Sequence, residues 1–239
     1  MERMDNDSAG KYIKALMDIS RAITSDLFLE DLLKLIVMVT AKVMDVDICS
    51  LWLIENEDES PVIRLKATQA IAPEYVKDRS LNMNEGVVGH VATHRKPLVL
   101  KNVLRSRRFK EKEMARRLGL ASMLGVPLQV KDGRTIGVLN CFTSTPHTFS
   151  QTEINLLTTV ANQAAVAIMN TELMVQRKVI QEELESRKRI ERAKEVLMQR
   201  RNMSGEQAFR WMQKKSMDSR TSMRQIAEAV LISEDLQHD

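Results

Sequence analysis

The spacing of hydrophobic and polar positions changes character twice along the chain. Residues 8–46 carry apolar side chains at helical spacing, and Ser25 or Asp26 is suited to cap a second helix there. Short apolar runs then predict strands, at residues 47–54, 62–67, 96–100, 122–130 and 135–142. After Pro146 the helical spacing returns and continues to the end. Strands between two helical regions predict an α+β protein.

The segments between the strands predict two hairpins and two irregular regions. Residues 55–59 form an acidic turn after the first strand, and the Asp-Gly pair within 131–134 is a hairpin signal between the last two. Residues 80–89 lead into a short helix over 90–94, and residues 105–119 are predicted to be a charged, mostly helical loop.

A very long helix is predicted after Pro146. Ser150 is a good N-cap with Glu153 as its capping-box partner, and no glycine follows until Gly205. A helix over 152–200 has about 50 residues and is roughly 75 Å long, so it must find a partner or link two domains. A short coiled-coil-like seam runs along it, with positions seven apart at Val166, Leu173 and Ile180.

The last residues predict a compact unit of three helices that includes the end of the long one. Ser204 with Gln207 forms a second capping box after the long helix breaks. A polar stretch over 216–222, longer than the tight turn of a helix-turn-helix, leads to a third helix from Met223. The inner face of the middle helix is predicted to hold Ala208, Phe209, Met212 and Ser216.

Charge divides the chain into two parts. Net charge is +4, and residues 1–175 hold 22 Lys+Arg and 21 Asp+Glu, a sum of +1. Residues 187–224 hold 12 basic and 4 acidic residues, a sum of +8. This asymmetry predicts a near-neutral domain joined to a small domain that binds a polyanion.

Composition excludes several classes of protein. The two cysteines, Cys49 and Cys141, are too few for a disulfide framework or a four-cysteine metal site. No apolar run reaches about 18 residues, and the polar, acidic start is unlike a signal peptide, so a cytoplasmic protein is expected. His90, His94 and His147 are too scattered to indicate haem or a metal ion, and no cofactor is identified.

Residues 12–172 resemble a GAF domain in the order and spacing of their motifs. The resemblance rests on the strand at 47–53, on Asn84-Glu85-Gly86-Val87-Val88-Gly89-His90-Val91-Ala92 with Lys96-Pro97-Leu98, on Leu124-Gly125-Val126-Pro127-Leu128 and Ile136-Gly137-Val138-Leu139, and on the segment 149–167. It implies an antiparallel sheet flanked by helices that binds a signal and is often dimeric. The signature of cyclic-nucleotide GAF domains is absent, because only its isolated pieces Asn102 and Phe109 are found.

Residues 187–232 resemble an ANTAR domain, the RNA-binding module of bacterial antiterminators. The residues that carry the resemblance are Ala193-Lys194, Leu197-Met198, Ser204, Glu206-Gln207-Ala208-Phe209, Met212, Ser216-Met217, Arg220, Met223 and Ile226-Ala227. The pair of resemblances implies a GAF sensor over 1–172, a helical linker over 173–186 and an ANTAR domain over 187–239.

The ANTAR resemblance implies recognition of paired small RNA hairpins in leader transcripts by a homodimer without enzymatic activity. The residues expected to contact RNA are Lys194, Arg200, Arg201, Arg210, Trp211, Gln213, Lys214, Arg220 and Arg224. Trp211 either stacks on a loop base or closes the small core. The expected signal pocket holds Trp52, Met123, Asn140 and Phe142, although strand residues of this kind are more often plain core.

Two other functions remain open. Three short helices can form a DNA-binding helix-turn-helix, which would make the chain a DNA-binding regulator with a GAF sensor. Some GAF-like proteins reduce methionine sulfoxide with cysteines, although Cys49 and Cys141 both fall in predicted strands. Regulation has two possible forms, transmission of rotation along the long helix or masking of the basic module by the sensor. Gly86 and Gly89 open a helix that could hold an anion, and a tight turn explains them equally well.

Overall fold

The computed structural model describes residues 29–57, 60–70 and 79–235. The chain divides into two units, residues 1–172 and 173–239, and each is described by itself. The helix predicted over residues 8–28, with its caps Ser25 and Asp26, lies outside the described residues.

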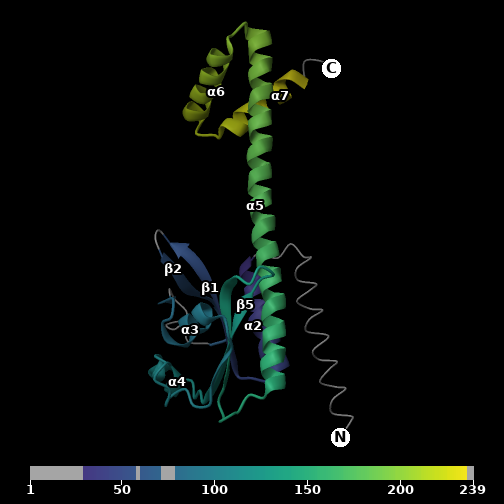
Figure 1. Ribbon diagram of the computed structural model, residues 1–239. Coiled ribbons are helices and arrows are strands. Elements are labelled where there is room, and N and C mark those ends of the chain that lie inside the picture. The colour runs from purple at the N-terminus through teal and green to yellow at the C-terminus, as the bar shows by residue number, and fades with distance from the viewer. Residues whose placement is uncertain (1–28, 58–59, 71–78, 236–239) are drawn as a thin grey trace. The chain divides into compact units, whose positions relative to one another are not determined.

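The first unit is built on a six-stranded sheet in which all neighbouring strands are antiparallel (Figure 1). The strand order is β3-β2-β1-β6-β5-β4, so the first and last long strands, β1 and β6, pair at the centre. The strands are β1 (Ile48–Glu57), β2 (Ser60–Thr68), β3 (Ser80–Asn82), β4 (Leu98–Leu100), β5 (Ser122–Gln129) and β6 (Thr135–Thr143). The predicted α+β fold with an antiparallel sheet is confirmed.

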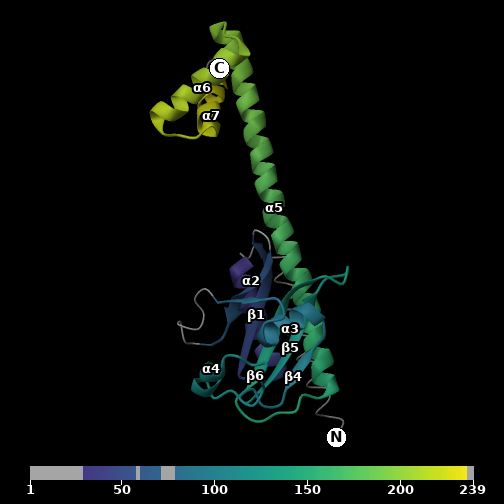
Figure 2. The same cartoon turned by 60° about the vertical axis from the view of Figure 1, so that its left-hand side comes forward.

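Helices cover both faces of this sheet (Figure 2). Helix α2 (Leu29–Met44) and the start of α5 (Gln151–Arg201) pack on one face, while α3 (Gly86–His94) and α4 (Lys112–Arg117) lie on the other. Successive side chains of a strand point to opposite faces, so Leu51 joins the first core and Trp52 the second. Each fully buried leucine contributes about 1.5–3 kcal/mol relative to an exposed one.

Three predicted local elements differ from the structure. The acidic turn over 55–59 is wrong for residues 55–57, which continue β1, and α3 begins at Gly86 rather than His90. The region 105–119 is helical only over Lys112–Arg117. Its first half is held instead by side chains that bond the local backbone, since Asn102 Oδ1 accepts from the Arg105 N–H and Ser106 Oγ from the Arg108 N–H.

The glycines that open α3 serve a tight turn. Gly86 has a φ of 64°, and a Cβ on Gly89 would collide with the carbonyl oxygen of Asn82. The Glu85 carboxylate accepts from the Asn82 backbone N–H at 2.9 Å and closes the same turn. The turn interpretation therefore accounts for both glycines.

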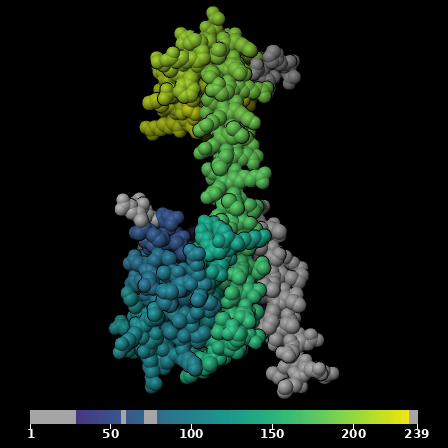
Figure 3. Space-filling model, viewed as in Figure 1, coloured from purple at the N-terminus to yellow at the C-terminus, as the bar shows by residue number. Residues whose placement is uncertain are grey.

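The second unit consists of the rest of α5 with α6 (Gly205–Ser219) and α7 (Met223–Asp235), coloured from green to yellow in Figure 3. Both predicted capping boxes are confirmed, Ser150 with Glu153 and Ser204 with Gln207. The core of the unit consists of Ala193, Val196, Leu197, Ala208, Met212, Ala227 and Val230.

Two predictions about the second unit are wrong. Phe209 is 44% exposed and does not belong to the core, because it lies about 100° around the helix from Ala208. The connection between α6 and α7 is only three residues long, 220–222, because the helix extends to Ser219 and Arg220 then caps it in the left-handed conformation with φ 52°. The stretch 216–222 is therefore not a long linker.

The helices of the described ranges are all too short or too polar to span a membrane.

Candidate functional site

The outer face of α6 gathers apolar, basic and amide side chains. Arg210, Gln213 and Lys214 are exposed, as predicted from their spacing relative to Ala208 and Met212. Phe209 and Met217 lie on the same face, with exposed fractions of 44% and 74%. An ion pair on this face joins Arg210 to Glu206 at 2.6 Å, and both side chains are about three-quarters exposed, so it adds little stability. We call Phe209, Arg210, Gln213, Lys214 and Met217 the α6 outer face.

Trp211 lies on the other flank of α6 and is only half-exposed. It packs against the core of the second unit, and the Arg201 guanidinium lies 4.6 Å from the centre of its ring. One ring face is thus already covered by a cation. An open groove beside it is lined by residues from α5, α6 and α7, among them Arg200, Arg201, Trp211 and Lys215.

The remaining predicted RNA contacts, Lys194, Arg220 and Arg224, take part in local interactions. Arg224 and Arg189 share the carboxylate of Glu228, which joins α7 to α5. The Arg224 hydrogen bond, followed by that of Arg189, lowers the pKa of Glu228. Lys194 is paired with Glu191, and Arg220 caps α6, so the structure gives Lys194 and Arg224 roles in local ion pairs.

Sequence reasoning missed Phe209 and Met217 as candidate site residues. The sequence did contain a signal. Ala208 and Met212 are four residues apart and therefore share one face of the helix, which is buried, whereas Phe209 does not lie on that face. The prediction assigned Phe209 to the core together with Ala208 because both are hydrophobic, and did not consider its position around the helix axis.

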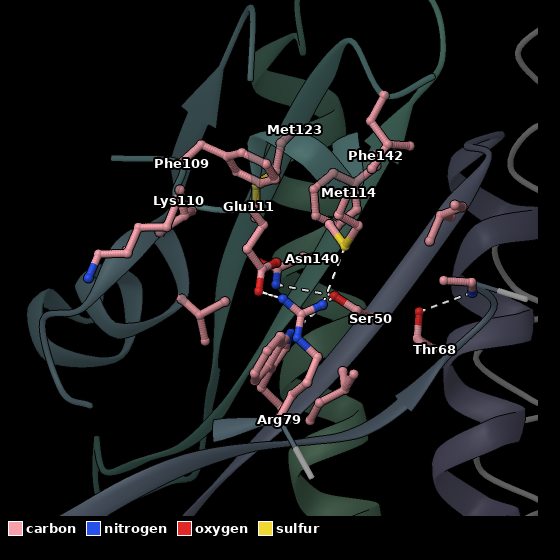
Figure 4. A pocket seen from close by; sticks show the side chains of 18 of the residues that line it. Ser50, Thr68, Arg79, Phe109, Lys110, Glu111, Met114, Met123, Asn140 and Phe142 are labelled. Atoms are coloured by element: carbon pink, nitrogen blue, oxygen red, sulfur yellow. Dashed lines mark hydrogen bonds and ion pairs between the residues drawn. The ribbon is translucent and has the colours of Figure 1, made fainter. Parts of the chain in front are cut away.

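The first unit contains a largely apolar cavity of about 60 Å³ between the sheet and the α3–α4 layer (Figure 4). The four predicted pocket residues, Trp52, Met123, Asn140 and Phe142, all line it. By the volume that one water molecule needs, the cavity has room for a few atoms.

A buried polar cluster forms one wall of this cavity. Ser50 Oγ accepts from Trp52 Nε1 at 3.1 Å and from Asn140 Nδ2 at 3.3 Å. Asn140 Oδ1 is buried without a hydrogen-bond partner among the described residues. Gly125 leaves room for it, since a Cβ there would lie 2.7 Å from that oxygen. A buried acceptor without a partner costs free energy that a donor on a bound molecule would recover.

An ion pair also lines the cavity. The Arg79 guanidinium is paired with Glu111, lies 6.0 Å from the Trp52 ring centre, and donates to Met114 Sδ at 3.3 Å (Figure 4). Sequence reasoning missed Arg79 and Glu111. No short-range signal could find them, because they are 32 positions apart and meet only in the folded sheet.

The two cysteines do not reach this cavity. Their Sγ atoms lie 3.3 Å apart on the paired strands β1 and β6, in the core on the α2–α5 side of the sheet. Burial, followed by the hydrogen bond with Cys49, raises the pKa of the Cys141 thiol well above its ordinary value. Such a thiol is a poor nucleophile, since the thiolate is the reactive form.

Comparisons with known proteins separate the chain into the same two regions. The GAF domain model matches residues 28–168, and the ANTAR domain model matches residues 178–231. The transcriptional regulatory protein PdtaR of Mycobacterium tuberculosis is 46% identical over 52 residues, which are 22% of this chain and 25% of that protein. The chain therefore spans about a quarter of the length of this relative.

Two further similarities concern the first unit. A dual 3',5'-cyclic-AMP and -GMP phosphodiesterase 11A of Takifugu rubripes is 27% identical over 168 residues, covering 66% of this chain and 18% of that protein. The crystal structure of the GAF domain from an Acinetobacter phosphoenolpyruvate-protein phosphotransferase has a TM-score of 0.57 and 28% identity, covering 69% of this chain and 97% of that one.

Proposed function

The chain belongs to the GAF family and carries an ANTAR domain after its GAF domain, and we propose from this premise that it is a signal-responsive, RNA-binding transcription antiterminator. In this proposal residues 1–172 sense the signal, residues 173–186 link the domains, and residues 187–239 recognise paired small hairpins in a leader transcript. The protein acts as a regulator rather than an enzyme, in line with its similarity to a transcriptional regulatory protein.

The observation that carries the proposal is the composition of the α6 outer face. Arg210 and Lys214 offer charge to phosphates, and Gln213 offers both a donor and an acceptor to base edges. Phe209 offers an exposed ring on which an unpaired loop base can stack. This combination suits a folded RNA with splayed loop bases.

Removal of both cations of the α6 outer face should weaken RNA binding about tenfold. Because each phosphate contact contributes about 0.7 to the slope of log K against log salt for single strands, Arg210→Ala/Lys214→Ala should flatten that slope by about 1.4. Gel shifts with a two-hairpin RNA over a salt series measure both effects.

A matched control removes two exposed lysines of α2, Lys34 and Lys42, and should change neither value. Equal affinities for the parent, the α6 variant and the control would rule out this face as the RNA contact.

DNA binding remains a second candidate because of the turn between α6 and α7. The three-residue connection at 220–222 is as short as the turn of a helix-turn-helix, which removes the length argument against that motif. Direct competition between hairpin RNA and duplex DNA for the full-length protein separates the two. Preference for the duplex would favour a DNA-binding regulator.

The proposed signal site is the cavity at Trp52, Met123, Asn140 and Phe142. Its apolar walls and the unpartnered Asn140 Oδ1 suit a small, largely apolar molecule that carries one N–H or O–H donor. A methionine sulfoxide reductase reaction has no support there, because neither thiol lines the cavity. Native mass spectrometry of freshly purified protein would identify a retained ligand.

The proposed homodimer rests on an unpaired stripe of α5. Leu173, Ile180 and Leu184 are between 52% and 66% exposed and line one open groove of the helix. With Leu173 and Ile180 at heptad position a, Glu172 and Arg177 take positions g and e. In a parallel pair, Glu172 of one copy would face Arg177 of the other, so the flanking charges suit a second copy of this chain.

Ile180→Glu should therefore convert the protein to a monomer at micromolar concentration, because it places two carboxylates in the apolar seam. Val175→Glu is the matched control, since Val175 is 55% exposed but lies about 200° around the helix from Leu173. Light scattering after size-exclusion chromatography gives both masses. A dimer that persists in Ile180→Glu would place the interface elsewhere.

A further inference from the structure

The net charge of the first 175 residues is near zero, but one segment among them is strongly basic. Residues 95–110 hold seven Lys+Arg and no Asp+Glu. By comparison, residues 187–224 hold 12 basic and 4 acidic residues over more than twice the length. The basic segment runs from the end of α3 through β4 into the loop before α4.

Its charged side chains are exposed, and one contact links the segment to the outer side of α3. Arg108 Nη1 lies 2.9 Å from Nδ1 of His90, which ties the loop to the helix. The His90 and His94 rings lie 3.9 Å apart on successive turns of α3. We call this region the α3 basic surface, and its exposed cations are Arg95, Lys96, Lys101, Arg105, Arg107 and Arg108.

Most of these cations are not neutralised within the fold. Among the described residues, no carboxylate pairs with the side chains of Lys96, Lys101, Arg105 or Arg107. Two carboxylates close to this segment are engaged with other cations, because Glu85 pairs with Lys110 at 2.7 Å and Glu111 pairs with Arg79. Like charges held together without counter-charges repel one another, and a bound polyanion relieves that repulsion.

We propose that the α3 basic surface binds the phosphate backbone of the RNA outside its hairpins. This inference rests on the proposed function, which supplies RNA as the polyanion. Phosphate contacts need charge and carry no sequence information, so this surface would add affinity without adding specificity. Four of these six residues are arginines, whose guanidinium groups match the geometry of phosphate oxygens.

An acidic protein is the less suitable occupant. The core of a protein interface is built from aromatic and aliphatic side chains. Here Val103 and Phe109 of the loop are at most 5% exposed, and Leu104 is half-buried and packs against the same core. The surface therefore offers charge without an apolar anchor, which is typical of backbone contacts to nucleic acid.

The test compares two RNAs on the full-length protein. One contains the two hairpins alone, and the other carries the same hairpins with single-stranded uridine tracts on both sides. The extended RNA should bind more tightly, and Arg105→Gln/Arg107→Gln should reduce this gain about three- to tenfold and flatten the salt slope by about 1.4. Binding of the hairpins alone should stay unchanged. Lys34→Gln/Lys42→Gln removes the same charge from α2 and should keep the full gain.

The outcomes separate this inference from the proposed function. An extension that adds no affinity, or a gain that both double variants lose equally, overturns the α3 basic surface and leaves hairpin recognition standing. Failure to bind either RNA overturns the proposed function itself. Displacement of the extended RNA by poly-glutamate as readily as by polyuridine would identify an acidic protein as the partner and overturn the inference. Equal thermal midpoints of the variants and the parent confirm that the fold is intact.

Discussion

Phe209→Ala should weaken binding of hairpin RNA by 10- to 100-fold while leaving the stability of the protein almost unchanged. Stacking of a base on an aromatic ring is worth about 1–3 kcal/mol by alanine substitution. The ring of Phe209 is 44% exposed and stands outside the core, so its removal leaves no cavity. Titration of the protein with a fluorescently labelled two-hairpin RNA measures the loss.

The control for this prediction is Ile232→Ala in α7, where a side chain that is 59% exposed is shortened in the same unit. It should bind RNA as the parent does. The loss in Phe209→Ala should also vanish for a blunt RNA duplex, which has no unstacked base to offer. A loss of equal size for the duplex, or no loss for the hairpins, would show that Phe209 does not stack on a loop base.

Trp211 is the less suitable stacking platform despite its larger ring. The Arg201 guanidinium already covers it at 4.6 Å, and the rest of the side chain packs on the core of the second unit. A base would have to displace this cation–π contact before it could stack. The adjacent groove, rimmed by Arg200 and Lys215, remains open to a backbone phosphate.

Local periodicity predicted most of the fold. The short apolar runs at residues 47–54 and 135–142 anticipated the central pair of strands, because a strand that is covered on both faces reads as a nearly continuous apolar run. The two capping boxes anticipated where α5 and α6 begin. These signals depend on residues that are close together in the sequence, so they can be recognised without knowledge of the tertiary structure.

The features that were missed depend on contacts between distant segments. The Arg79–Glu111 pair forms only when the region before β3 meets the start of α4. The predicted helix over 105–119 fails in its first half because side chains of Asn102 and Ser106 compete for the backbone N–H groups. The α3 basic surface was hidden for another reason, because net charge summed over a whole domain averages out local segregation.

Met212→Ala should unfold the second unit and abolish RNA binding, with the first unit left folded. Met212 is fully buried between α5, α6 and α7, and truncation of such a side chain costs about 2–5 kcal/mol. A unit of this size has few core residues, so a loss of about 3 kcal/mol lowers its folding equilibrium more than a hundredfold. Thermal unfolding followed by circular dichroism should lose an early helical transition and retain the later one.

Met217→Ala makes the same chemical change five residues along α6, at a side chain that is 74% exposed. It should alter stability by less than about 0.5 kcal/mol, because it removes no buried contact. The pair of variants therefore separates loss of the three-helix core from loss of the α6 outer face. If Met217→Ala also unfolds the unit, Met217 is covered in the assembled protein, and the α6 outer face then belongs to an interface rather than to the RNA-binding surface.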